Sequence, residues 1–149
     1  MNVNIRQAVL ADAETVAPLF DGYRQSYHQN EDLPLARAFI HERLAMQDSL
    51  ILLAEDSMEV CVGFIQMYPS FSSVSARRIW IMNDLYVPSS ARGQGVGKAL
   101  LNAARAHALA TGAKRLVLST AHDNPAQKLY EAMGYQRDQY FYHYSLTLD

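Results

Sequence analysis

The sequence contains a single cysteine, Cys61, which lies in the apolar stretch from Val60 to Val62. One cysteine cannot form an internal disulfide or a cysteine-based metal cluster, so we expect Cys61 to be a small buried hydrophobic residue. The five histidines show no metal-ligand spacing such as H-x-x-x-H. No metal is therefore expected.

Long apolar runs are also missing. None approaches the length of about 20 residues that a membrane-spanning helix needs. The polar start from Met1 to Asn4 does not resemble an export signal. We therefore expect a cytoplasmic protein with no membrane partner.

Neither sign of charge dominates the sequence, since the formal net charge is −2. This balance argues against a general nucleic-acid binder. Residues 1–60 hold ten acidic and four basic side chains, whereas the rest holds five acidic and nine basic ones. A basic C-terminal part would suit an anionic ligand and an acidic N-terminal part a cationic one, although ordinary surface charge explains the same distribution.

The chain of 149 residues has the size of about one domain, which we expect to span residues 1–149. The periodicity of its apolar residues predicts helices and strands in a mixed order. Strands are expected at 3–9, 49–55, 60–67, 79–87, 115–120 and 140–148. A first helix is expected to follow an N-cap at Asp12, further helices are expected at 35–46, 95–111 and 125–133, and a loop is expected at 69–75. This order predicts an α/β protein with a mixed sheet covered by helices.

Three glycines, Gly93, Gly95 and Gly97, stand where a strand ends and a helix begins. The first backbone N–H groups of a helix lack internal partners and attract anions, and glycine allows a ligand to approach closely. Arg92 and Lys98 add positive charge beside the loop. We therefore predict that this loop binds a pyrophosphate, the alternative being a simple connecting turn.

Other phosphate-binding motifs fit this loop poorly. A Walker loop needs a glycine and a hydroxyl at the positions of Arg92 and Ala99. The dinucleotide motif needs glycine where Lys98 or Leu100 stands. A magnesium-dependent nucleotide switch and a nicotinamide enzyme are both disfavoured.

The segment Arg92-Gly93-Gln94-Gly95-Val96-Gly97 resembles the acetyl-CoA motif Q/R-x-x-G-x-G/A of the GNAT superfamily of N-acetyltransferases. Residues 124–135 resemble the second signature of that superfamily, with an asparagine, A-x-x-L-Y and G-F/Y. Tyr23 and Tyr27, together with residues 83–87, are similar to the histone- and polyamine-acetyltransferase branch. The resemblance is close from Ile81 onwards, whereas residues 1–60 match only in layout.

This resemblance implies a GNAT-like fold, with a central twisted, mostly antiparallel sheet, a splayed parallel strand pair and helices on both faces. It also implies acetyl-CoA as cosubstrate and a primary amine as acceptor: a polyamine, a protein lysine or N-terminus, an aminoglycoside-like drug, an amino acid or another small amine. The residues implied to bind acetyl-CoA are Leu85, Tyr86, Val87, Arg92, Gly93, Gln94, Gly95, Val96, Gly97, Lys98 and Asn124. Asp123 stands at the usual place of the asparagine, so either Asp123 or Asn124 contacts CoA.

Tyr130 falls where the superfamily has its general acid, and a phenol of pKa about 10 can protonate a departing thiolate. An alkyl amine is neutral in only about one molecule in a thousand at pH 7, so a base must help its attack. Asp84 is the nearest acidic candidate, with a structural ion pair as the alternative. Asn83 cannot act as a base, and a water relay is the other route for the proton.

Tyr23, Tyr27 and Asn83 are candidate substrate residues, and Tyr68 and Phe71 are further candidates for the wall of an acceptor pocket. A module that binds acetyl-CoA without turnover is the alternative function, and it would need no acid at position 130. The aromatic segment Tyr140 to Tyr144 could pair at a sheet edge, so a homodimer is an alternative to a monomer.

Overall fold

The computed structural model describes all 149 residues and divides into two compact units, residues 1–119 and 120–149. Short 3₁₀ turns at Leu10–Asp12 and Ser89–Ala91 accompany the regular elements of the first unit. Its regular elements are β1 (Asn4–Gln7), α1 (Ala13–Ser26), α2 (Leu33–Met46), β2 (Leu50–Glu55), β3 (Cys61–Ser72), β4 (Arg77–Tyr86), α3 (Val96–Ala110) and β5 (Leu116–Val117). The second unit contains one helix, α4 (Gln127–Ala132).

The first unit contains a five-stranded sheet in the order β1-β2-β3-β4-β5. The first four strands pair antiparallel, and β5 pairs parallel to β4. The predicted mixed sheet is confirmed. A bulge interrupts the β3–β4 ladder, since Gln66 pairs with Asp84 and Met67 with Met82, which leaves Asn83 as the extra residue.

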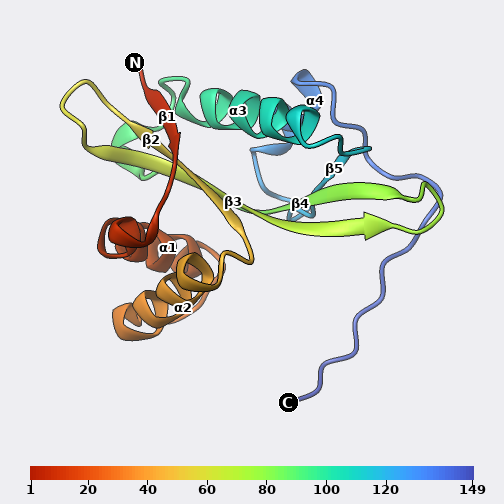
Figure 1. The fold of residues 1–149 in the computed structure, drawn as a ribbon, viewed down its shortest axis with the longest axis horizontal. Coiled ribbons are helices and arrows are strands. Elements are labelled where there is room, and N and C mark those ends of the chain that lie inside the picture. Colours follow the sequence, from red (N-terminus) through yellow and green to blue (C-terminus); the bar gives the residue numbers. More distant parts are fainter. The chain divides into compact units, whose positions relative to one another are not determined.

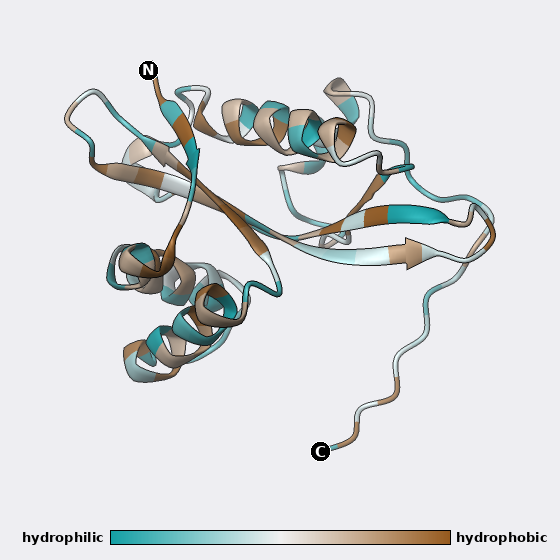
Figure 2. Ribbon diagram, in the orientation of Figure 1, coloured by the Kyte–Doolittle hydropathy of each residue, from teal (hydrophilic) through white to brown (hydrophobic).

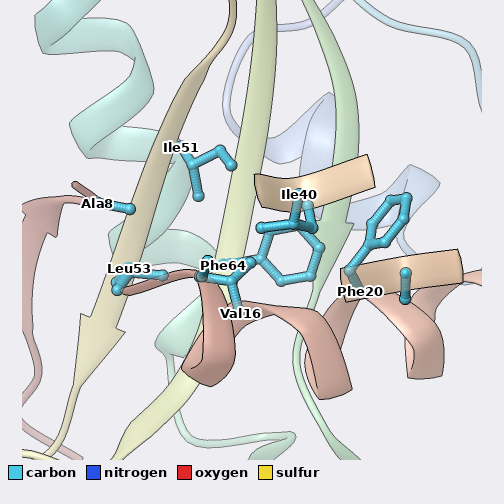
Figure 3. Close-up of a cluster of buried hydrophobic side chains, with 9 residues drawn as sticks. Ala8, Val16, Phe20, Ile40, Ile51, Leu53 and Phe64 are labelled. Atoms are coloured by element: carbon cyan, nitrogen blue, oxygen red, sulfur yellow. The ribbon is translucent and has the colours of Figure 1, made fainter. Parts of the chain in front are cut away.

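One face of the sheet packs against α1 and α2. Side chains alternate between the two faces of a strand, so Ile51 and Leu53 of β2 lie on the same face. They join Phe64 of β3 in a buried cluster with Val16 of α1 and Ile40 of α2 (Figure 3). Burying each such side chain stabilises the fold by about 1.5–3 kcal/mol.

The opposite face is covered by α3 (Figure 1). Gly63 of β3 pairs with Ala54 of β2, and a Cβ added at Gly63 would lie 3.1 Å from Val96 and 3.3 Å from Leu100 of α3. Figure 2 shows that β2 and the middle of β3, which separate the two helical layers, are mostly hydrophobic. The predicted placement of helices on both faces is confirmed.

The predicted loop at 69–75 is only partly right, because β3 continues to Ser72. Pro69 pairs with Trp80, whose own N–H donates to Arg115 on the other side of β4. The β2–β3 pairing ends at Leu50 and Met67, so Pro69 lies on a stretch of β3 whose second edge has no strand partner. Proline is tolerated there because no ladder hydrogen bond is lost.

The predicted strand at 140–148 is wrong, since this segment forms no strand. Its Tyr140 and Phe141 amides donate to the Asp138 carboxylate, and its large apolar side chains are 75% to 92% exposed. Alternating apolar residues predict the face that a strand would bury, but a strand also needs a partner for its backbone.

None of the helices is long and apolar enough to cross a bilayer.

Candidate functional site

The glycine loop connects β4 to α3 in the first unit. After Tyr86, Pro88 precedes the short turn Ser89–Ala91, and Gly95 then serves as the N-cap of α3 with φ 85°. Gly93 also has a positive φ, 72°. Both glycines therefore adopt the left-handed conformation, which side-chain-bearing residues adopt only at a cost.

The start of α3 offers its backbone donors to solvent. No side chain caps it, since the N-cap residue is glycine. The first N–H groups of a helix have no partner within the helix, so those of Val96, Gly97 and Lys98 remain available. A Cβ added at Gly93 or Gly95 would meet no atom within 4 Å, which leaves open space in front of these donors. This geometry fits an anion such as a pyrophosphate.

The side chains around the loop supply positive charge without covering it. Arg92 is exposed, and its Nε donates to the Val87 carbonyl at 2.8 Å, which leaves the terminal nitrogens of the guanidinium without a partner. Gln94 donates to the Ser90 carbonyl at 3.3 Å, within the loop itself. Lys98 is exposed on the first turn of α3. The sequence-predicted residues from Arg92 to Lys98 thus surround one open space.

Beside this loop, one edge of β4 is unpaired. The short strand β5 contacts β4 only at Trp80 and Ile81, so no strand pairs with that edge from Met82 onwards. On its other edge, β4 still pairs with β3 up to Tyr86. Apart from the Val87 carbonyl, which accepts from Arg92 Nε, the backbone groups of residues 85–87 on the open edge are therefore available to an extended amide-containing chain. This splayed edge has the geometry expected from the sequence.

Two close approaches fix the end of β4. A Cβ added at Gly22 of α1 would lie 2.6 Å from the Tyr86 hydroxyl, so Gly22 makes room for that ring. A Cβ added at Gly63 would lie 3.1 Å from the Tyr86 carbonyl oxygen and 3.1 Å from Val96. Gly63 therefore sets how closely the start of α3 lies against the end of β4.

Replacing Gly63 by alanine is expected to lower the free energy of unfolding by about 1–3 kcal/mol, because the added methyl overpacks a backbone contact that cannot rotate away. It should also weaken pyrophosphate binding at the start of α3, since α3 must move away from β4. Urea denaturation and titration calorimetry would measure both effects. An unchanged unfolding free energy and an unchanged dissociation constant would show that Gly63 does not position the helix.

Asp84 is buried in β4, with 1% of its surface exposed. Its carboxylate accepts hydrogen bonds from Gln66 Nε2 at 2.7 Å and from Asn83 Nδ2 at 2.9 Å. Burial raises the pKa of Asp84 above its usual value, and these two amides oppose the rise. Asp84 forms no ion pair, so the structural ion pair considered from the sequence is not present.

A cavity of about 290 Å³ lies next to Asp84, between α1, α2, β3 and β4. Its lining combines aromatic and aliphatic side chains with a few polar groups: Phe20, Tyr23, Arg24, Leu35, Phe39, Tyr68, Asn83 and Asp84. Burial and the charge of Asp84 raise the pKa of Tyr68 to about 12, so its phenol stays neutral. We call this space the aromatic cavity.

The structure brings together most of the candidate substrate residues. Tyr23 and Asn83 both line the aromatic cavity, and the Tyr23 hydroxyl donates to the Asn83 carbonyl at 2.8 Å. Tyr27 does not line the cavity but packs against Tyr23 at a tilted angle, with ring centroids 5.0 Å apart. Phe71 is 70% exposed beside Arg78 and lies outside the cavity wall.

Sequence reasoning missed four residues of the cavity wall, Phe20, Arg24, Leu35 and Phe39. They belong to α1 and α2, whose residues match the family motifs only in layout. Phe20 and Phe39 stack at 5.2 Å between ring centroids. Their helical spacing indicates a packed face but not which part of that face remains open, so no local signal distinguished them from ordinary core residues.

The second unit contains the remaining candidates. Tyr130 lies in α4, is 9% exposed and has its ring 5.9 Å from that of Tyr135. The Asn124 side-chain oxygen accepts from the Ala126 amide at 2.9 Å, just before α4, which leaves its Nδ2 as the available donor. Asp123 and Asn124 both line a hollow of about 420 Å³ in this unit.

Sequence and structure comparisons give consistent matches. The family described as "Acetyltransferase (GNAT) family" matches residues 14–135. "Uncharacterized N-acetyltransferase YhfO" of Bacillus subtilis (strain 168) is 50% identical over 147 residues, which is 98% of each chain. The crystal structure of a probable acetyltransferase is similar with a TM-score of 0.92 and 42% identity, covering 98% of each chain. The ribosomal-protein-alanine N-acetyltransferase of Brucella melitensis biovar Abortus 2308 has a TM-score of 0.80 at 26% identity, covering 98% of this chain and 100% of that one.

Proposed function

We propose that this chain, which belongs to the acetyltransferase (GNAT) family, transfers an acetyl group from acetyl-CoA to a primary amine. The observation that carries the proposal is the uncapped, open start of α3 beside the splayed edge of β4. One feature can bind a pyrophosphate and the other an extended amide chain. CoA contains both groups in one molecule.

In this proposal the chain binds CoA mainly through its backbone. The amides of residues 93–98 bind the pyrophosphate, assisted by the helix dipole and by Arg92 and Lys98. The open edge of residues 85–87 hydrogen-bonds the pantetheine arm. Asn124, or Asp123 beside it, is proposed to contact CoA as well. The family match, which runs from 14 to 135 through both units, supports a single acetyltransferase domain over residues 1–149.

Acetyl-CoA supplies a thioester whose carbonyl carbon the neutral amine attacks directly, in a complex that holds both substrates. Asp84 attracts the ammonium form of the acceptor and takes its proton, directly or through a water molecule. Its raised pKa suits this role, because a base works best when its pKa lies near the working pH. Holding the two reactants together supplies much of the acceleration.

No covalent acyl-enzyme is needed. Burial raises the pKa of the Cys61 thiol, so this residue lacks the thiolate that a nucleophile requires. As the amine nitrogen bonds to the carbonyl carbon, the carbon–sulfur bond breaks and a thiolate departs. Tyr130 is proposed to give that thiolate a proton. The nitrogen of the new amide then releases its remaining extra proton, which restores the Tyr130 phenol through water.

The Tyr130→Phe variant is expected to release CoA about 100-fold more slowly than the wild type, because the departing thiolate loses its proton donor. A thiol-reactive dye would follow release from acetyl-CoA with a panel of amines. Tyr135→Phe, which removes the neighbouring phenol, serves as the matched control. Equal rates for Tyr130→Phe and wild type would remove the acid role.

A module that binds acetyl-CoA without turnover is the alternative function. It would keep the glycine loop but would need neither Asp84 nor Tyr130. Saturable binding of acetyl-CoA without thiol release from any amine would favour it.

We also propose that the protein acts in the cytoplasm as a homodimer, in which the exposed segment Tyr140 to Tyr144 pairs at a sheet edge. The exposed row of aromatic and aliphatic side chains supports this pairing. Light scattering on the purified protein measures the mass directly. A monomeric mass would contradict it.

A further inference from the structure

The wall of the aromatic cavity indicates what kind of acceptor body fits. Phe20 and Phe39 present stacked rings from two helices, and Leu35 and Tyr68 complete an apolar surface around about 290 Å³. Removing apolar surface from water stabilises a complex, so such a wall favours an aliphatic or aromatic body. The same wall provides few hydrogen-bond partners for a molecule that carries many hydroxyl or ammonium groups.

Arg24, which carries a guanidinium, also lines this cavity. Its Nη1 donates to Asp21 Oδ1 at 3.0 Å and to the Asn30 carbonyl at 3.3 Å, while its Nε and Nη2 have no hydrogen-bond partner. The Arg24 side chain is half-buried, with 18% of its surface exposed. These two nitrogens are therefore donors suited to a carboxylate in the cavity.

Asp21 does not offer a second anionic site to an acceptor. It is 4% exposed, and its oxygens already accept from Arg24, from Gln25 Nε2 and from the Asp32 amide. Its hydrogen bonds hold α1 to the segment that leads into α2. Asp84 is thus the one carboxylate lining the cavity, and its hydrogen-bond partners are the side-chain amides of Gln66 and Asn83.

The cavity therefore presents one anionic group, one cationic group and an apolar wall. We propose that the acceptor is a small amino carboxylic acid with an apolar body, whose ammonium group lies at Asp84 and whose carboxylate is bound by Arg24. This inference rests on the proposed acetyl transfer and narrows its acceptor. A polyamine would place a second ammonium group near Arg24, where like charges repel.

The test compares matched acceptors at fixed acetyl-CoA. Leucine and phenylalanine are paired with 3-methylbutylamine and phenethylamine, which lack only the carboxylate, and spermidine represents the polyamines. The wild type is expected to show a kcat/KM for each amino acid at least about tenfold above that of its paired amine, in line with one charge-assisted hydrogen-bond pair. The carboxylate also lowers the basicity of the amine, so this ratio alone does not isolate Arg24.

The Arg24→Gln variant isolates the contribution of the guanidinium. It is expected to lower the amino-acid to amine ratio about tenfold, because both acceptors are measured on the same protein and their basicities are unchanged. Any loss of folded protein cancels in the ratio. Arg37→Gln, which removes the exposed arginine paired with Glu14, is the matched control and should leave the ratio unchanged.

An unchanged ratio in Arg24→Gln, or spermidine as the best acceptor, would overturn the inference while leaving acetyl transfer intact. Thiol release with none of these amines, despite saturable acetyl-CoA binding, would contradict the proposed function itself and this inference with it. The two failures give different results in the same assay.

Discussion

Replacing Asp84 by asparagine is expected to lower kcat by about 100-fold or more, because the only carboxylate lining the aromatic cavity can then no longer take the proton of the acceptor amine. The wild-type rate should rise with pH through the raised pKa of Asp84. The variant should lose this part of the pH profile. Steady-state kinetics over a pH series would measure both effects.

The Asp84→Asn variant is expected to be at least as stable as the wild type at neutral pH. Burial raises the folded-state pKa of Asp84, so its ionisation on raising the pH costs stability, and this cost is fully present above the raised pKa. Asparagine avoids the cost. The stability gain should therefore shrink as the pH falls towards the usual range of an aspartate, about 4.

Glu31→Gln, at an exposed position, removes one negative charge as well and serves as the control. It should change neither the rate nor the stability noticeably. A fully active Asp84→Asn variant would remove Asp84 from the mechanism. A less stable variant at neutral pH would contradict the cost assigned to its buried charge.

Replacing Gly95 by valine is expected to raise the dissociation constant for acetyl-CoA by about 100-fold. Its φ of 85° forces a branched residue into the left-handed region, which costs about 1–3 kcal/mol. The new side chain also enters the open space in front of the first α3 amides. If the start of α3 shifts to relieve this strain, its first backbone N–H groups turn away from a bound pyrophosphate.

Gly112→Val is the matched control for the weakened acetyl-CoA binding of Gly95→Val. Gly112 has φ 71° just beyond the other end of the same helix, and it too has no atom near an added Cβ. The two variants should lose similar unfolding free energy in urea denaturation, but calorimetry should show weakened acetyl-CoA binding for Gly95→Val alone. Equal losses of affinity would mean that general destabilisation explains the effect.

The glycine loop and the elements around it could be predicted from the sequence, because local chemistry specifies them. Gly95 must accept a left-handed conformation, and the residues from Val96 to Ala110 are mostly good helix formers such as alanine and leucine. The order of strands and helices up to α4 follows from periodicity in the same way.

The acceptor side could not be predicted to the same extent, because it depends on packing between distant segments. Arg24 enters the cavity wall through the packing of α1 against α2 and β4, and its helical neighbours do not reveal this. The environment of Asp84 depends on Gln66, which is brought beside it by the register of β3 and β4 at the bulge. The strand prediction for residues 140–148 was wrong for a related reason. The alternation of apolar residues does not show whether a neighbouring strand is available to pair with the segment.

The most direct test of the central claim is a titration of ¹⁵N-labelled protein with acetyl-CoA, followed by the amide signals in NMR spectra. The expected result is saturable binding in which the amides of Val96, Gly97 and Lys98 show the largest shifts, because they donate to the pyrophosphate. Binding that leaves these three amides unmoved, or no binding to the folded protein, would contradict it.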